Sequence, residues 1–206
     1  MAYNFTGTQR LDATRTISGF PRTHAMWLFP TSTASGVTRD SLLSLSTPSF
    51  HRNTIRWFST DGTNNTLQAV TTGTNGSGNS ESPTTFGANE WVHLAAVFSS
   101  TTSRRAYLNG VGGTLNTFDV GTQEDTVNIL VGNLTAGRIA EAAIWSAALS
   151  ADEIASLAKG VTCGKVRPQS LIYYAPLIRD LQDLRGGLTI TNTNSATVTN
   201  HPRVYK

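Results

Sequence analysis

Acidic and nucleophilic side chains are sparse in this sequence, and their spacing limits the chemistry that the chain can perform. Hydrolysis of a glycosidic bond needs two carboxylates that face one bond, and the pKa of one of them must be raised so that it acts as the acid. Glu141 is the only acid in its predicted strand, Arg138–Trp145. No G-x-S-x-G turn and no glycine-rich phosphate loop occurs. We therefore expect a non-catalytic protein in which Glu141 is a hydrogen-bonded or rim carboxylate; a glycosidase that depends on Glu141 is the alternative.

Metal-ligating residues do not form a complete set in any one segment. The single cysteine, Cys163, lies in a predicted connector, and His93 alternates with apolar residues as a half-buried strand residue would. The four histidines show no i, i+4 pair. Two short stretches are rich in the hard oxygen ligands that calcium prefers, namely Asp61, Asn64 and Asn65, and Glu124 with Asp125. We expect no metal and no other cofactor, with calcium as the alternative.

Aromatic side chains indicate where a sugar ring could stack. Trp27, Trp91 and Trp145 lie in apolar strands and are expected in the core. Trp57 is ambiguous, because strand alternation places it opposite Phe58, beside the turn at Asp61. The candidate ligand-binding residues are therefore Trp57, Asp61, Asn64 and Asn65, although a core position for Trp57 is favoured.

The elements that would position these side chains are mostly short strands. Apolar or alternating runs separated by turn residues are typical of strands, and they occur at 25–29, 41–45, 54–58, 66–71, 91–98, 104–108, 127–131 and 138–145. The low-complexity stretch Thr72–Pro83 is expected to be an exposed loop or flexible rim. These patterns predict an all-β protein, an antiparallel β-sandwich.

One short α-helix is predicted near residues 150–159. Ser150 and Glu153 have the S-x-x-E spacing of a capping box, in which each side chain satisfies a free backbone N–H group. Leu149 and Ile154 flank the cap as a hydrophobic staple, and Gly160 is placed for a left-handed C-terminal cap.

Several of these segments together resemble the laminin-G-like domains of the concanavalin A-like lectin/glucanase superfamily. The resemblance rests on Phe5-Thr-Gly-Thr8, Ala25-Met-Trp-Leu-Phe-Pro30, Trp91-Val-His-Leu-Ala-Ala-Val-Phe98, Arg105-Ala-Tyr-Leu-Asn-Gly110 and the strand–helix run Gly137–Gly160. It implies a jelly-roll sandwich over about residues 3–160. The paired acids of glucanases in this superfamily, Glu-x-Asp-x-x-Glu, are absent.

The remainder of the chain resembles the N-terminal segment of the family's domains, although here it follows the other motifs. Leu171–Leu177, Asp183, Gly186–Ile190 and Ala196–Val198 follow a pattern that precedes the Phe-x-Gly strand in many relatives. We therefore divide the chain into a sandwich at 1–160 and a segment at 161–206. This segment is expected to complete the same sandwich in circularly permuted order, since domain termini often lie close together. A separate docking appendage is the alternative.

Charge is low and unevenly distributed. Charged residues are 14% of the 206 residues, and the net charge is +3. Residues 159–206 carry seven Lys and Arg against two Asp, a net +5. Such a segment can dock on an acidic surface or simply aid solubility, and its candidate docking residues are Arg167, Arg179, Arg185, Arg203 and Lys206. Few aromatic residues alternate with these cations, which argues against nucleic acid as the partner.

The expected function follows from these exclusions and from a narrower resemblance. The chain opens in strand-like sequence without a signal-peptide pattern, and no apolar run approaches the roughly 20 residues that span a bilayer. We therefore expect no membrane partner. The ending Asn200-His-Pro-Arg-Val-Tyr205 is similar to endings of laminin-G-like proteins of tailed bacteriophages.

That resemblance implies a virion structural or interaction protein, a capsid decoration (cement) or surface-fibre protein. Such a protein would be made in the host cytoplasm and displayed on the virion surface. Its expected partner is a capsid or other virion protein, and it is expected to be a homo-oligomer or bound to a lattice. A lectin-like module that binds host or environmental glycans is the alternative.

Overall fold

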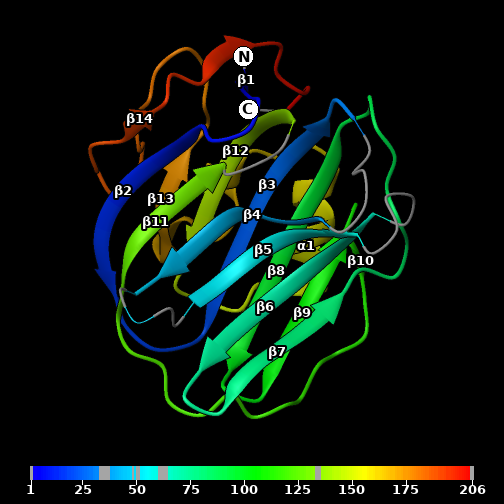
Figure 1. The fold of residues 1–206 in the computed structure, drawn as a ribbon, viewed down its shortest axis with the longest axis vertical. Helices are drawn as coiled ribbons and strands as arrows, with labels where there is room; N and C mark the ends of the chain where they lie inside the picture. The colour runs from blue at the N-terminus through cyan, green and yellow to red at the C-terminus, as the bar shows by residue number, and fades with distance from the viewer. Residues whose placement is uncertain are drawn as a thin grey trace.

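Two antiparallel sheets pack face to face in the computed structural model, as Figure 1 shows. The structure describes residues 2–32, 38–47, 49, 52–59, 65–132 and 136–204. This architecture confirms the predicted β-sandwich with a jelly-roll, concanavalin A-like fold. None of the helices in the described part of the chain is long and apolar enough to cross a membrane.

The eight-stranded sheet lies farther from the viewer in Figure 1. Its order is β10 (Val111–Gly112), β9 (Ser103–Leu108), β8 (Val92–Ser100), β3 (Arg22–Pro30), β12 (Gly137–Trp145), β1 (Ala2–Phe5) and β15 (Thr197–Thr199), with β13 (Leu171–Ala175) also paired to β12. The partners β1 and β13 share one side of β12, where β1 pairs with residues 137–139 and β13 with residues 142–145.

The seven-stranded sheet lies in front of it. Its order is β14 (Thr191–Thr193), β2 (Arg10–Ile17), β11 (Thr126–Gly132), β4 (Thr38–Ser46), β5 (Arg52–Ser59), β6 (Thr66–Gly73) and β7 (Gly76–Glu81). Strand β2 has no counterpart among the predicted strands, although Leu11, Ala13 and Ile17 are buried and Arg10 and Thr14 are exposed. That alternation of period two was a usable signal.

The stretch Thr72–Pro83 was expected to be a loop, and that prediction was wrong. It forms the end of β6, a turn at Thr74–Asn75 and the edge strand β7. Ser80 is buried here and ties β7 to the other sheet, because its Oγ accepts a hydrogen bond from Ala106 N (3.0 Å) and donates one to Thr114 O (2.6 Å). Strand β7 therefore depends on pairing and tertiary contacts rather than on apolar side chains.

The C-terminal segment contributes strands to both sheets. β13 pairs with β12, β14 with β2, and β15 with β1. Asp183 and the 3-10 turns Cys163–Lys165 and Pro168–Ser170 also belong to this segment. The circularly permuted order relative to the family stays a prediction.

The core has two parts. The larger lies between the sheets and includes Met26, Leu43, Ile55 and Ile139. The smaller lies on the outer face of the eight-stranded sheet, under α1 (Ala151–Ala158) and the connector after it; its members include Ala95, Trp145, Ile154, Leu157 and Cys163. Helix α1 and the connector together cover the outer face of the eight-stranded sheet.

The predicted helix and its caps are confirmed. The backbone N–H of Glu153 donates to Ser150 Oγ (3.3 Å), and Glu153 Oε2 accepts from Ser150 N (2.7 Å). Leu149 and Ile154 are both buried, as a staple requires. At the other end Gly160 has a φ of 92°, and Gly160 N and Val161 N donate to Leu157 O and Ser156 O. This is the Schellman pattern that terminates a helix.

Candidate functional site

The outer face of the seven-stranded sheet carries hydrogen-bonding side chains in cross-strand rows. Arg56 on β5, Gln68 on β6 and Glu81 on β7 are register partners. Arg56 Nε donates to Gln68 Oε1 (3.0 Å), and Gln68 Nε2 donates to Glu81 Oε1 (2.5 Å). The Arg56 guanidinium also lies 5.6 Å from the ring centroid of Phe58. A half-buried aromatic ring thus stands beside a row of polar groups that hydrogen bonds hold in place.

A hollow of about 320 Å³ lies on the same face over β2, β11 and β4. Its polar lining includes Arg10, Asp12, Thr14, Ser46 and Asn128. Arg10 Nε contacts both oxygens of Asp12 (3.0 and 2.9 Å), and Asp12 Oδ2 also accepts from Thr193 Oγ1 (2.7 Å). The hollow presents these donors and acceptors on the outer face of the sheet.

The predicted stacking residue Trp57 is not on this face. Its side chain is 1% exposed, and its Nε1 donates to Asn65 Oδ1 (2.9 Å) inside the core. Ile55 and Trp57 point between the sheets, which turns Phe58 outward. The assignment of Trp57 and Asn65 to a ligand site is therefore corrected, because a buried ring and an amide oxygen already bonded to it cannot meet a sugar. Asp61 and Asn64 lie outside the described residues.

Sequence reasoning missed Phe58 and the row beside it. Period-two alternation places Trp57 and Phe58 on opposite faces of β5 but does not say which face is the inner one. The uncertainty lay in which of the two aromatic residues, Trp57 or Phe58, was the inward one.

Trp27 and Trp91 were expected in the core, and that prediction was wrong for both. They are half-buried, whereas Trp145 is fully buried and donates from Nε1 to Val166 O (2.8 Å). Met26 and Leu28 take the inner face of β3, so Trp27 and Phe29 lie on its outer face. There the ring of Phe29 packs at 5.5 Å against Trp91, and Arg138 stacks over Phe29 at 4.7 Å.

Glu141 is a buried structural carboxylate. It sits at a bulge in β12 with a φ of 54°, between the segments paired to β1 and β13, and is 2% exposed. Its Oε2 accepts hydrogen bonds from Tyr174 Oη (2.7 Å) and Thr162 Oγ1 (3.2 Å), and its Oε1 lies 3.4 Å from His201 Nε2. Burial and the neighbouring Glu141 raise the pKa of Tyr174, so its hydroxyl stays a donor.

A second buried carboxylate, Asp183, also holds the C-terminal segment. Its Oδ1 accepts from Tyr174 N (2.9 Å) and Arg185 N (3.1 Å), and its Oδ2 accepts from Leu188 N (3.3 Å). Tyr174 therefore connects the two carboxylates, through its hydroxyl to Glu141 and through its backbone to Asp183. Both carboxylates are buried and have hydrogen-bond partners within the chain, Glu141 through Oε2 and Asp183 through both oxygens.

The remaining candidates for metal or nucleophilic chemistry have structural surroundings. Burial raises the pKa of the Cys163 thiol well above its usual value, which keeps it protonated. His93 is fully buried rather than half-buried, and burial lowers its pKa to about 3. Within the described parts of the chain, no three His, Cys, Asp or Glu side chains cluster as a metal site would require. Glu124 and Asp125 are exposed, and calcium binding stays a prediction.

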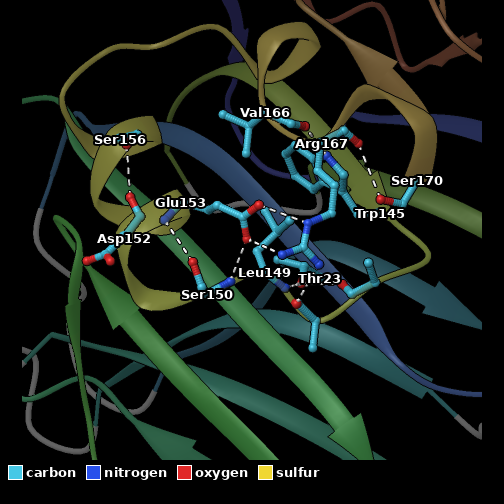
Figure 2. A network of polar contacts seen from close by, with 12 residues as sticks. Thr23, Trp145, Leu149, Ser150, Asp152, Glu153, Ser156, Val166, Arg167 and Ser170 are labelled. Atoms are coloured by element: carbon cyan, nitrogen blue, oxygen red, sulfur yellow. Dashed lines mark hydrogen bonds and ion pairs between the residues drawn. The ribbon is translucent and has the colours of Figure 1, made fainter.

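The predicted docking residues differ in their surroundings. Figure 2 shows Arg167 turned inward, where its Nε and Nη2 donate to Glu153 Oε1 (2.8 Å) and Oε2 (2.7 Å). Arg185 is exposed but also donates from Nε to Leu171 O (3.2 Å). Arg179 and Arg203 are exposed, and Lys206 lies outside the described residues. Arg167 is therefore a structural residue, and its place among the docking residues is corrected.

Comparison with known proteins shows the family. The model of the laminin-G-type family described as the concanavalin A-like lectin/glucanases superfamily matches residues 6–155. The chain belongs to this family. It is a lectin-like domain of a class that is generally a binding module. No curated protein sequence matches the chain.

Solved structures share the fold at low sequence identity. A native heptameric pentraxin from Limulus polyphemus has a TM-score of 0.65 at 13% identity, over 95% of this chain and 93% of that one. The enzymatically active domain of tailspike protein 2 from bacteriophage CBA120 has a TM-score of 0.59 at 11% identity, over 85% of this chain and 34% of that one. Domain 4 of an extracellular arabinanase from Geobacillus stearothermophilus, solved with arabinotriose, has a TM-score of 0.51 at 20% identity, over 69% and 68%.

Proposed function

We propose that the chain is a non-catalytic binding domain on the surface of a tailed-bacteriophage virion, a capsid decoration or fibre protein docked to another virion protein. It would be made in the host cytoplasm and displayed on the particle. The observation that carries the non-catalytic part is the position of Glu141 and Asp183, which are buried and hydrogen-bonded to the C-terminal segment. Glycosidic hydrolysis needs two carboxylates free to face a substrate.

The virion part of this proposal is supported by two likenesses. A tailspike domain of a bacteriophage has a similar fold, and the sequence Asn200-His-Pro-Arg-Val-Tyr205 is similar to a sequence in phage laminin-G-like proteins. The C-terminal segment exposes Arg179, Arg185 and Arg203, each of which can pair with a carboxylate of an acidic partner.

Particles of the phage that encodes the chain provide the test. The protein should be found on purified particles by mass spectrometry and labelled at their surface by immunogold. A chain with Arg179→Ser, Arg185→Ser and Arg203→Ser should lose most of its docking to particles that lack it, whereas Arg10→Ser, an exposed cation on the other sheet, should dock normally. Absence from the particles, or unchanged docking of the triple variant, would refute the proposal.

A second function, glycan binding, is favoured by the outer face of the seven-stranded sheet. Phe58 offers a ring next to Arg56, Gln68 and Glu81, which are already held in place by hydrogen bonds to one another. Fixed polar groups beside an apolar surface are the usual means of orienting a small ligand. The solved arabinanase domain holds arabinotriose.

A glycan array that includes arabino-oligosaccharides tests this second function. Phe58→Ala should abolish the binding of any sugar found, and Thr16→Ala, at an exposed position of β2 outside the hollow, should leave it intact. Absence of binding at millimolar sugar would exclude glycan recognition, and equal binding by Phe58→Ala would exclude this site.

A further inference from the structure

A hollow of about 300 Å³ lies on the outer face of the eight-stranded sheet, at the N-terminal end of α1. Outward-facing residues of β8 and β9 line it, among them Val97, Arg105 and Tyr107. Ser150 and Ala151 border it from the helix. This α1 hollow is separate from the candidate sites described above, because those lie on the other sheet.

Arg105 is the only charged residue among the described residues that line the α1 hollow. It is half-buried, and its guanidinium makes no hydrogen bond or ion pair with any described residue; its Nε is fully buried. The neighbouring Arg104, in contrast, donates to Asn116 Oδ1 (2.6 Å) and Phe118 O (2.9 Å). Charged donors that are withdrawn from water without an acceptor are costly. Arg105 is therefore a cation whose partner is missing from the described chain.

Tyr107 brings a second unpaired donor to the same hollow. It lies two residues further along β9, so strand alternation places it on the same face as Arg105. Tyr107 is only 7% exposed, and its hydroxyl has no hydrogen-bond partner among the described residues. Buried tyrosine hydroxyls usually find one, as Tyr3 Oη does at Arg179 O (2.8 Å). The free hydroxyl thus points independently to a ligand that accepts hydrogen bonds.

The first turn of α1 supplies backbone donors beside these two side chains. The N–H of Glu153 donates to Ser150 Oγ, but those of Ala151 and Asp152 have no acceptor among the described residues. Unpaired N–H groups and the helix dipole favour an anion at such an end. The Glu153 carboxylate is already bonded to Arg167 and Ser150 N, whereas the exposed Asp152 carboxylate opposes an anion here.

We propose that the α1 hollow binds a small oxyanion, the phosphate or carboxylate group of a ligand. The forked guanidinium of Arg105 matches the oxygens of either group, and it supplies the opposite charge. The Tyr107 hydroxyl and the Ala151 N–H donate to the remaining oxygens. Val97 and Leu149 give the hollow an apolar wall for the carbon part of the ligand. This site does not depend on the proposed virion or glycan function, since neither uses its residues.

Titration with sodium phosphate and, separately, with sodium acetate tests the proposal. Backbone amide NMR signals are followed at constant ionic strength. At least one of the two anions should shift the signals of Ala151 and Asp152 saturably, with a Kd in the millimolar range. Tighter binding of phosphate identifies a phosphate ligand, and tighter binding of acetate identifies a carboxylate ligand. Absence of saturable shifts with both anions, up to tens of millimolar, would overturn the proposal.

Two variants locate the site. Arg105→Gln and Tyr107→Phe should each weaken binding on the order of tenfold, because each removes a hydrogen bond to a charged group. Arg138→Gln is the matched control, since Arg138 is a half-buried cation on the same outer face but does not line the hollow. It should bind the anion like wild type.

Unchanged affinity in Arg105→Gln or in Tyr107→Phe would overturn the proposal, as would an equal loss in Arg138→Gln. Circular dichroism and melting temperature verify that each variant is folded. If Arg105→Gln unfolds, Tyr107→Phe decides alone, because it keeps the buried ring and removes only the hydroxyl.

Discussion

Glu153 and Arg167 form a two-point ion pair that joins the first turn of α1 to the connector after it. The two contacts are 2.8 and 2.7 Å, and the same carboxylate accepts the capping hydrogen bond from Ser150 N at 2.7 Å. Figure 2 shows further hydrogen bonds beside this pair. Trp145 Nε1 donates to Val166 O. Thr23 Oγ1 donates to Ala147 O and accepts from Leu149 N. One glutamate therefore caps the helix and anchors the chain that returns to β13.

Loss of the charge on Glu153 should destabilise the protein measurably. Burial alone would raise the pKa of Glu153, but hydrogen bonds from Ser150 and the charge of Arg167 outweigh it and lower that pKa. Glu153→Gln should reduce the free energy of unfolding at neutral pH by about 1 kcal/mol, the usual contribution of a cap or a partly exposed pair. Urea titration measures this, with the exposed Asp152→Asn as control. Equal effects of the two substitutions would contradict the role of Glu153.

Gly160 should resist replacement because its φ of 92° lies in the left-handed region. Gly160→Ala is expected to cost about 1 kcal/mol, since a Cβ there crowds the backbone. Gly164→Ala is the matched control, because Gly164 has no such φ and its added Cβ would meet Tyr174 at an ordinary 3.7 Å. Thermal melting compares the two. A Gly160→Ala protein as stable as Gly164→Ala would argue against the Schellman cap.

Tyr174 and Glu141 should be energetically coupled. Tyr174→Phe leaves Glu141 Oε2 with Thr162 as its remaining donor, and an under-satisfied buried acceptor costs about 1–3 kcal/mol. Once Glu141→Gln has replaced the carboxylate by an amide, Tyr174→Phe should cost less. A double-mutant cycle by urea unfolding measures the coupling energy. Strictly additive effects would show that the 2.7 Å contact contributes nothing.

His24 and His93 should make stability fall in acid. Burial lowers the pKa of both to about 3 from an ordinary 6.5, and for His24 the charge of Arg22 contributes. Above pH 6.5 neither the folded nor the unfolded protein binds a proton at these histidines, so the free energy of unfolding does not depend on them. Between pH 6.5 and about 3 only the unfolded state binds it, so the free energy of unfolding should fall by about 1.4 kcal/mol per pH unit for each histidine.

The share of His93 can be isolated by urea unfolding at a series of pH values. His93→Phe, which keeps a ring beside Trp27, should reduce the acid slope by the contribution of one histidine. An unchanged slope would mean that His93 titrates normally in the folded protein.

Local signals in the sequence determined the elements whose ends are set by neighbouring residues. Ser150, Glu153 and Gly160 predicted both ends of α1, because caps act over a few residues and need no distant partner. The predicted strands likewise fall within observed strands or one residue outside them, since apolar alternation directly records a buried face. The family resemblance rested on the same segments and was confirmed over residues 6–155.

Tertiary structure decided what distant partners determine. Sequence could not tell whether Trp57 or Phe58 faced inward, because a slip of one residue in register exchanges the two faces of a strand. It could not reveal β7, whose small polar residues are held by β6 and by Ser80 across to Ala106. Nor could it show that Glu141, Tyr174 and Asp183 hold the C-terminal strands, since those contacts join residues 9 to 33 positions apart. Local sequence patterns specified two sheets and a capped helix, while long-range strand pairing determined which side chains lie on the outer faces of the sheets.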